Sequence, residues 1–335
     1  MKKVTMRDIG KAVGVSAVTV SKAMAGESGV SEAMRQKILQ TAAEMGYVNP
    51  NVAKQREKRG LDIGVLIPER FFGEGTYYAM LYKLLVQSLA DAGHFCLLEL
   101  LEAGEEAALV QPNLIRNRRV DGLILLGQPS KAYLQLIAGQ TTPVVFLDFY
   151  DDQARADAVV GDNTYGCYRL TSHLIKNGHK DIGFIGDTAA TSSIMDRYLG
   201  FMRAMITHDL PIRPECVVKE RDDKGNYIHL ELPEKLPTAF VCNCDNVARH
   251  LIEQLRQEGV RVPEDVSVVG FDDYLPGGAI QPALSTFRLD YQTIIDTAVK
   301  LIVDRCNGVV RLCGRVVVGG YPVYRDSDRA LGENE

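Results

Sequence analysis

The sequence contains no run of apolar residues that approaches the roughly 20 residues of a membrane-spanning helix. Its first residues are polar where a secretory signal peptide would be hydrophobic, so we expect neither membrane insertion nor export and predict a cytoplasmic protein. The seven cysteines are an odd number without regular spacing, which excludes the framework of a disulfide-stapled secreted domain. Reduced thiols of a cytoplasmic chain fit this pattern better.

Common catalytic signatures are also missing. The chain has none of the motifs G-x-G-x-x-G, G-x-x-x-x-G-K-S/T, H-E-x-x-H and G-x-S-x-G. None of the six histidines has a nucleophile or an acid at a spacing typical of catalysis, so no enzyme is predicted. Cys242, Cys244 and nearby His250 supply three soft ligands without a fourth, and buried thiols are favoured over a metal site. No cofactor is predicted.

What is present is an ordinary globular composition with an uneven distribution of charge. The chain has 335 residues, of which 46% are hydrophobic and 24% charged, enough for two domains with a sizeable core. Residues 1–60 carry eleven lysines and arginines but five acidic residues, whereas the whole chain has a net charge of −5. This asymmetry indicates a small basic module that meets a polyanion, although a chance gradient of surface charge would produce it too.

Hydrophobic periodicity divides the chain into three regions. Residues 1–47 predict short helices, one of them capped by Ser31 and ended near Gly46. Residues 48–60 form a polar, basic connector, and from residue 61 apolar strands alternate with amphipathic helices. The predicted strands are 62–68, 95–101, 121–126, 144–149, 182–186, 239–242 and 266–271, and the clearest helices are 77–92, 165–177, 196–207 and 246–258. This alternation predicts two parallel, doubly wound sheets in series.

Residues 6–25 fit the helix-turn-helix template. The template needs a small residue where the helices cross, a glycine in the turn, and inward aliphatic residues at fixed offsets. The residues in these roles are Ile9, Gly10, Val13, Gly14, Val15, Val20 and Ala23, and Ser16 would cap the second helix. An unrelated three-helix domain is the alternative.

The second helix of such a unit enters the major groove, where its outward residues meet base edges. The predicted base contacts are Ala17, Val18, Ser21 and Lys22. Lys22 could donate to guanine or remain solvated, while Ala17 and Val18 offer apolar contact to a thymine methyl group. Phosphate contacts, which position the protein without reading sequence, are predicted for Thr5, Thr19, Ser31 and Arg35, and Ser16 completes this DNA-binding set.

The segments VTMRDIGKAVGVSAVTVSKAMAGESGVSEAMRQKI and GYVNPNVAK resemble the DNA-binding headpiece of the LacI/GalR repressor family. The likeness continues in family order through DNTYG (162–166), HLIKNGHKDIGFIGD (173–187), DRYLGF (196–201), GVRVPEDVSVVGFDD (259–273) and YRDS (324–327). It implies a small all-α helix-turn-helix headpiece plus an α/β effector domain made of two Rossmann-like lobes of the periplasmic binding protein type I fold. The implied boundaries are 1–47 for the headpiece, 48–60 for the hinge, and 61–335 for the effector and dimerisation domain, with an N-lobe of about 61–160 plus 291–320 and a C-lobe of about 161–290 plus 321–331.

The family pattern further implies that residues 50–59 form a hinge helix, one per protomer, that orders in the minor groove of operator DNA. The DNA-binding residues predicted here are Asn51, Ala53, Lys54 and Arg56. Members of the family usually wedge a leucine between the central base steps, and Arg56 stands at that position. We therefore expect weaker central kinking, with Arg56 in a narrowed minor groove or at a phosphate.

A small ligand enclosed between the two lobes is implied by the same resemblance. The sequence favours this place independently, because polar residues follow the predicted strands, and ligands of parallel sheets bind beyond the carboxyl ends of the strands. The predicted contacts are Phe71, Phe72, Asp148, Arg197, Cys244, Asp245, Asp272 and Tyr291. Carboxylates and a guanidinium fork suit the hydroxyl groups of a sugar, and aromatic rings suit its apolar face.

Two alternatives stay open at this predicted site. The acidic residues would serve equally well as helix caps, Arg197 as part of a surface or inter-lobe ion pair, and the two phenylalanines as core. In addition, the family commonly has asparagine where this chain has Cys244, so an amide that binds sugar is missing.

Together these observations predict a ligand-responsive transcriptional regulator, in the simplest case a repressor, that binds a palindromic operator in double-stranded DNA as a homodimer. A sugar or sugar derivative would set its affinity for DNA. The chain ends without the apolar heptad segment that forms tetramers in some relatives, so a dimer without a membrane partner is expected. The alternatives are a sugar-binding transport receptor and a Rossmann-like enzyme, neither of which would bind DNA.

Overall fold

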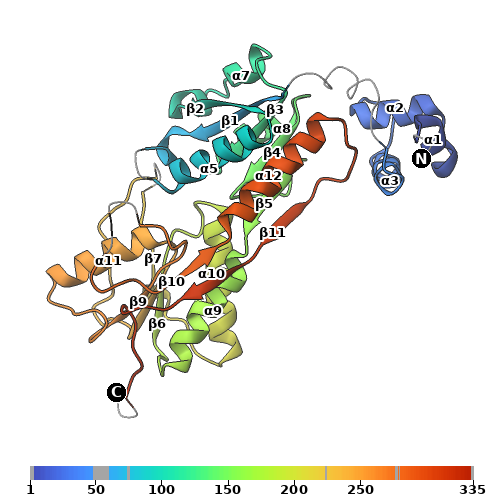
Figure 1. Cartoon of the computed structure of the whole chain (residues 1–335). Coiled ribbons are helices and arrows are strands. Elements are labelled where there is room, and N and C mark those ends of the chain that lie inside the picture. The colour runs from blue at the N-terminus through green and yellow to red at the C-terminus, as the bar shows by residue number, and fades with distance from the viewer. Residues whose placement is uncertain are drawn as a thin grey trace.

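The computed structural model describes residues 4–47, 60–73, 76–222, 225–275, 278 and 280–332. Three helices at the N-terminus stand apart from a longer body of two α/β lobes (Figure 1). Within the described residues, no helix is long and apolar enough to cross a membrane.

The N-terminal helices begin and end at residues suited to those places. These helices are α1 (Met6–Val13), α2 (Ala17–Ala25) and α3 (Glu32–Glu44). Ser16 and Ser31 cap α2 and α3, since each hydroxyl accepts from the backbone N–H three residues later. Gly14 ends α1 with a φ of 84°, which glycine adopts without strain. A Cβ on Gly10 would lie 2.6 Å from the Val15 carbonyl oxygen, so the approach of the turn to α1 requires glycine.

Seven buried side chains hold the three helices together. They are Ile9, Val13, Val20, Ala23, Ile38, Ala42 and Tyr47. Four of these are the inward residues of the helix-turn-helix template, and Val15 is half-buried against the cluster, so the predicted packing is confirmed. The cluster is separate from the cores of the lobes, and an ion pair of 2.7 Å between Glu32 and Arg155 touches the first lobe.

The first lobe is built on a six-stranded parallel sheet in the order β11-β5-β4-β3-β1-β2. Its strands are β1 (Asp62–Pro68), β2 (Phe95–Leu101), β3 (Gly122–Leu126), β4 (Val144–Leu147), β5 (Asp157–Gly161) and β11 (Arg315–Val318). Its helices are α5 (Tyr77–Asp91), α6 (Ala103–Ala107), α7 (Asn113–Arg116), α8 (Lys131–Ala138) and α12 (Tyr291–Cys306). Every residue of β3 is buried, which explains its continuous apolar sequence.

The second lobe has a four-stranded parallel sheet in the order β7-β6-β8-β9. Its strands are β6 (Ile182–Ile185), β7 (Val217–Val218), β8 (Ala239–Cys242) and β9 (Ser267–Val269), and its helices are α9 (Asn163–Lys176), α10 (Ser192–Thr207) and α11 (Asp245–Gln257). Two parallel sheets, each with helices packed against it, confirm the predicted fold class.

Three chain crossovers join the lobes, after β5, after β10 (Thr286–Leu289) and after β11. β10 pairs antiparallel with β12 (Gly320–Val323), so two of the crossing segments lie side by side (Figure 1). The lobes are therefore connected by short segments at one side of the interface, and a change of the angle between them requires few backbone rotations.

The sequence predicted seven of the described strands and missed five. All seven predicted strands are present within a few residues, but β5, β7, β10, β11 and β12 were not predicted. β7 has two residues and β11 is largely exposed, so neither produces a strong hydrophobic pattern. Helix α10 begins at Ser192 rather than at residue 196, because the Thr191 hydroxyl caps it by accepting from the N–H of Ile194.

Candidate functional site

The outer face of α2 presents side chains that have no part in the small core. Val18 is 66% exposed, Ser21 and Lys22 are exposed, and Ala17 is half-buried. Val20 and Ala23 lie on the opposite, buried face. The four residues predicted to contact bases therefore share the accessible face of a helix whose orientation the core fixes.

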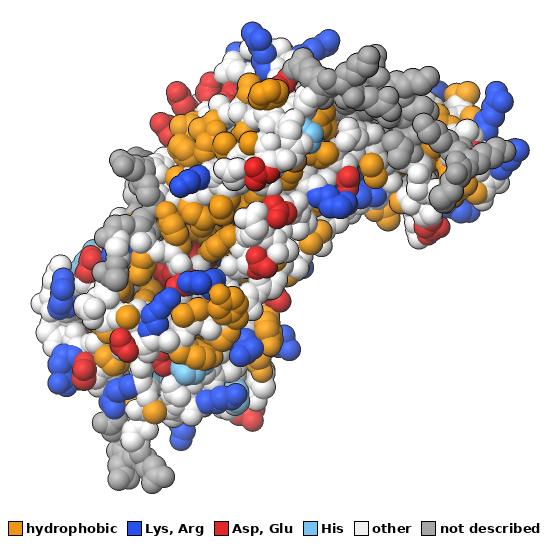
Figure 2. Space-filling view, viewed as in Figure 1, with side chains coloured by type: hydrophobic (Ala, Val, Ile, Leu, Met, Phe, Trp, Pro, Cys, Tyr) orange, Lys and Arg blue, Asp and Glu red, His pale blue; other side chains and the backbone are white. Residues whose placement is uncertain are grey.

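Hydroxyl groups stand at the N-termini of all three helices. Thr5 and Asp8 form a capping box on α1, in which the Thr5 hydroxyl lies 2.6 Å from the carboxylate. On α2 the Ser16 hydroxyl accepts from the N–H of Thr19 at 3.1 Å, and the Ser31 hydroxyl caps α3. Helix N-termini bind phosphate readily, because their first N–H groups lack partners and the helix dipole favours an anion. Lysine and arginine side chains lie on the surface around these helices (Figure 2).

Arg35 does not have the role that the sequence predicts. Its side chain is buried rather than free for a phosphate, and it donates to the carbonyl oxygens of Lys22, Ala23 and Glu27, the last at 2.6 Å. The final carbonyl groups of a helix have no partner within the helix, and a cation is favourable there. The prediction of a phosphate contact is therefore wrong for Arg35, which instead fastens the end of α2 to α3.

The predicted hinge contacts Asn51, Ala53, Lys54 and Arg56 lie outside the described residues. Their roles stay predictions.

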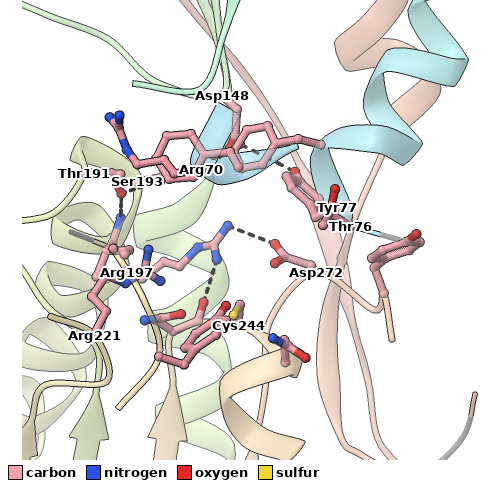
Figure 3. Close-up of a pocket in the computed structure, with 18 residues that line it drawn as sticks. Arg70, Thr76, Tyr77, Asp148, Thr191, Ser193, Arg197, Arg221, Cys244 and Asp272 are labelled. Carbon is pink, nitrogen blue, oxygen red and sulfur yellow. Dashed lines mark hydrogen bonds and ion pairs between the residues drawn. The ribbon is translucent and has the colours of Figure 1, made fainter. Parts of the chain in front are cut away.

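A cavity of about 220 Å³ opens between the two lobes, at the carboxyl ends of their strands (Figure 3). It is small beside the roughly 300–1,000 Å³ typical of sites for drug-sized ligands. The first lobe contributes Arg70, Phe71, Thr76, Tyr77, Tyr78 and Asp148, and the second lobe contributes, among others, Thr191, Ser193, Arg197, Arg221, Tyr227, Asn243, Cys244, Asn246, Asp272 and Tyr274. Five of the eight predicted ligand contacts line it: Phe71, Asp148, Arg197, Cys244 and Asp272.

Arg197 is the buried centre of the second-lobe wall. Its Nε donates to Asn163 Oδ1 at 2.8 Å, its Nη1 to the Asn243 carbonyl oxygen at 2.5 Å, and its Nη2 to Asp272 Oδ1 at 2.9 Å. Its guanidinium carbon also lies 4.0 Å from the centre of the Phe271 ring. Burial alone lowers the pKa of Arg197, but Asp272 and then Asp148 raise it above its ordinary value, so the group stays charged.

Two aspartates face Arg197 from different lobes, and both have left-handed backbone conformations. Asp148 follows β4 with a φ of 71°, and Asp272 lies beyond β9 with a φ of 103°. Such conformations are strained for residues other than glycine and persist where the surrounding structure demands them. Asp148 accepts from the hydroxyl groups of Tyr78 at 3.0 Å and Tyr77 at 3.5 Å (Figure 3).

Burial disfavours the charge of both carboxylates. It raises the pKa of Asp148 above its ordinary value, although Arg197 and the two tyrosine hydroxyl groups oppose this. Burial raises the pKa of Asp272 to about 7, with Arg197 opposing and Asp148 adding to the shift. A ligand group that offsets the cost of burying these charges would therefore stabilise the cavity.

Three predicted ligand contacts lie behind the wall instead of on it. Asp245 begins α11, and its buried carboxylate accepts from the Thr286 hydroxyl at 2.6 Å and the Tyr274 N–H at 2.7 Å. The Tyr291 hydroxyl donates to the backbone carbonyl of Asp272. Phe72 packs against Tyr82, with 5.9 Å between ring centres. These side chains support the wall from behind and do not line the cavity.

Cys244 does line the cavity, whereas Cys242 is buried behind it. Burial raises the pKa of the Cys244 thiol to about 11, so the thiol is neutral and a weak donor. No group of three or more metal-ligating side chains is placed to hold an ion anywhere in the described part of the chain.

Several residues of the cavity wall were not predicted from the sequence. Tyr77 and Tyr78 open α5, just after the loop that follows β1, and the Thr76 hydroxyl caps that helix. A pair of tyrosines at the start of the helix after the first strand was a usable signal, since such a helix begins at the carboxyl edge of the sheet. Arg221 and Tyr227 come from the irregular segment after β7, whose sequence shows no periodic pattern.

Two separate parts of the chain match models of known protein families. Residues 5–51 match the family model described as bacterial regulatory proteins, lacI family, and residues 171–327 match a periplasmic binding protein-like domain. This chain is similar to the LacI family over the first of these ranges. It is also similar to curated repressors: the HTH-type transcriptional repressor PurR of Glaesserella parasuis serovar 5 (strain SH0165) is 29% identical over 309 residues, and the ribose operon repressor of Haemophilus influenzae is 27% identical over 311. Each alignment covers 90% of this chain, and 89% and 91% of the relatives.

Solved structures share the fold of this chain over nearly its whole length. A complex of the transcriptional regulator CelR with cellobiose has a TM-score of 0.69 at 21% identity, covering 97% of this chain and 100% of that one. The lac repressor dimer bound to operator and the anti-inducer ONPF has a TM-score of 0.67 at 23% identity, covering 98% and 100%. At these identities the likeness establishes the architecture, a helical headpiece on two α/β lobes.

Proposed function

We propose that this protein is a ligand-responsive transcriptional regulator, in the simplest case a repressor, that binds a palindromic operator as a homodimer. Its affinity for DNA would be set by a small molecule, such as a sugar or sugar derivative, held between the lobes. This proposal rests on two features found in one chain, the exposed face of α2 and the separate polar cavity between the two lobes. The repressor names of the similar proteins support it.

On the DNA side, α2 would lie in the major groove with Ala17, Val18, Ser21 and Lys22 at base edges. The hydroxyl groups of Thr5, Ser16, Thr19 and Ser31 would approach phosphates. The hinge residues Asn51, Ala53, Lys54 and Arg56 would lie at the minor groove, with Arg56 in a narrowed groove or at a phosphate. Two copies of the headpiece would read two half-sites, because a two-fold dimer matches a palindrome.

On the ligand side, Asp148, Arg197 and Asp272 would bind polar groups, Phe71 would cover an apolar face, and Cys244 would contribute a small neutral surface. A ligand bound between the lobes would change the angle at the three crossovers and thereby the spacing of two headpieces in a dimer. The coupling is reciprocal, since the ligand changes DNA affinity by the factor by which DNA changes ligand affinity.

Selection of the purified full-length protein on a library of random duplexes tests this proposal. We expect enrichment of a palindromic sequence, and an affinity for it that falls steeply as salt rises, because bound cationic groups release counterions from DNA. Enrichment of no duplex at low ionic strength would contradict it and would favour a transport receptor or an enzyme on the same fold. The Lys22→Ala variant serves as the control for the assigned reading face.

A further inference from the structure

The cavity wall carries a carboxylate whose charge no arginine cancels by direct contact. Each guanidinium group of the wall is paired with a carboxylate of its own. The pairs are Arg197–Asp272 (2.9 Å), Arg70–Glu106 (2.5 Å) and Arg221–Glu220 (2.6 Å). Among the described residues Asp148 forms no ion pair, and its hydrogen bonds come from the neutral hydroxyl groups of Tyr77 and Tyr78. The lining holds three arginines and two aspartates, and Asp148 is the one of these two acids that has no cation in direct contact.

Among the described residues, a second acid without an ion pair lies directly behind this wall. Asp245 is buried, accepts from neutral donors, and has a pKa raised well above its ordinary value by burial and by nearby Asp272. Asp148 and Asp272 also have raised pKa values. An anionic ligand would place a second negative charge near Asp148, and the three arginines of the wall are already paired with carboxylates. The electrostatics of the cavity therefore disfavour phosphorylated or carboxylated ligands.

Aromatic rings surround the uncancelled carboxylate of Asp148. Phe71 and Tyr78 stack with 5.2 Å between ring centres, and Tyr77 meets Tyr78 edge-on at 5.4 Å and Tyr274 at 6.3 Å. An ammonium group is attracted to the faces of aromatic rings and supplies three hydrogen-bond donors but no acceptor. A carboxylate among tyrosine rings thus suits a primary ammonium group better than a neutral hydroxyl, which leaves the buried charge uncancelled.

We propose that the effector carries a protonated amine, as an amino sugar does, and that its ammonium group binds Asp148 beside Tyr77 and Tyr78. This inference rests on the proposed function, because it names the chemical class of the effector in the same cavity. Arg197 and Asp272 remain paired and receive the hydroxyl groups of the ligand from the other lobe.

The decisive variant is Asp148→Asn, which removes the charge and little else. Asparagine matches aspartate in size and tolerates the left-handed backbone found here. The two tyrosine hydroxyl groups donate to different oxygens of Asp148, so the single amide oxygen of asparagine keeps one of these two hydrogen bonds. The matched control is Asp152→Asn, which removes the same charge from an exposed side chain four residues further along the chain.

Calorimetric titration and thermal shift of the full-length proteins test the proposal with two series of probes at equal ionic strength. The first is D-glucosamine, D-glucose and D-glucuronate, and the second is ethanolamine, ethylene glycol and glycolate, so each amine and each acid differs from its neutral counterpart at one carbon. We expect the amine to bind about tenfold tighter than its neutral counterpart and the acid to bind weakest. Asp148→Asn should bring the ratio of amine to neutral affinity to about one, whereas Asp152→Asn should keep it.

Three results would overturn the proposal. These are binding of a neutral or acidic probe as tight as that of its amine, an amine preference that survives Asp148→Asn, and no binding of either amine by the wild-type protein. Duplex selection on the same preparations separates this inference from the proposed function. If a palindrome is enriched while the amine preference is absent, the effector class alone is wrong; if no duplex is enriched, the regulator itself is wrong.

Discussion

The headpiece and the ligand cavity arrange their charged side chains in opposite ways. In the headpiece, Lys22 and its neighbours are exposed on one face of α2, and the buried Arg35 donates to backbone carbonyls. In the cavity, Arg197 and Asp272 are buried and paired, and each depends on the other for its charge. Binding by the headpiece should therefore respond to salt, and binding by the cavity to protonation and to exact hydrogen-bond geometry.

The largest expected effect comes from Arg197→Met. The change leaves Asp272 and Asp148 buried without the cation that favours their charged forms, so we expect a loss of about 3–5 kcal/mol in the free energy of unfolding of the lobes. Ligand binding should disappear. Urea denaturation and calorimetric titration measure the two effects. The double variant Arg197→Met/Asp272→Asn should recover part of the stability but no ligand binding; a double variant no more stable than Arg197→Met would contradict the pairing.

A smaller effect, confined to the headpiece, is expected from Arg35→Met. Loss of the guanidinium leaves the carbonyls of Lys22 and Ala23 without this donor, which should cost about 1–3 kcal/mol of headpiece stability. Duplex affinity should fall, while titration of the cavity should give an unchanged ligand affinity. Arg35→Lys is the control. Its single ammonium group reaches fewer carbonyls than the guanidinium fork, so its headpiece stability and duplex affinity should lie between those of the wild type and of Arg35→Met. If duplex affinity is unchanged in Arg35→Met, this residue does not position α2.

Lys22→Ala tests base reading without touching the core. Since Lys22 is exposed, we expect unchanged thermal stability and about a tenfold loss of affinity for the selected duplex. Preference at one position of each half-site should also relax. The exposed Lys37 of α3 provides the comparison, and Lys37→Ala should weaken binding less and equally for all sequences. A uniform loss for Lys22→Ala would reassign this residue from a base to a phosphate.

The last expected effect, modest for each pH unit, is a pH dependence of stability that originates in the cavity. Burial raises the pKa of Asp272 from 3.8 to about 7, so the folded protein holds a proton that the unfolded chain releases. The free energy of unfolding should therefore fall as pH rises between about 4 and 7, by at most about 1.4 kcal/mol per pH unit for this group. Asp148, whose pKa burial also raises, contributes with the same sign. Urea denaturation at several pH values across this range measures how the free energy of unfolding depends on pH. This pH dependence should be weaker for Asp272→Asn and unchanged for Asp152→Asn.

The two regions also differ in how much of them the sequence could predict. The caps at Ser16 and Ser31, the turn at Gly14 and the inward residues of α1 and α2 were all predicted correctly, because their partners lie three to five residues away or in the adjacent helix. Arg35 was misassigned, since its carbonyl partners in α2 depend on the packing of α3, which the spacing of residues does not reveal.

In the cavity, the sequence located the strand ends but not the direction of the side chains there. Asp148 and Asp272 face the cavity, while Asp245 turns back to Thr286, although all three are acids beyond apolar strands. That difference depends on long-range contacts, such as the bond from Asp245 to a strand more than forty residues later in the chain. The fold class was predictable for the opposite reason, since the apolar pattern of each buried strand is contained in its own sequence.

Reciprocal coupling between the headpiece and the cavity is the most direct test of the central claim that this chain joins a DNA reader to a ligand receptor. Duplex affinity is measured with and without the probe that gives the largest thermal shift, and probe affinity with and without the selected duplex. The account predicts two factors that are equal to each other and different from one, and a duplex affinity that no longer responds to the probe in Arg197→Met. Equal affinities in the presence and absence of the probe, for a wild-type protein that binds both partners, would contradict it.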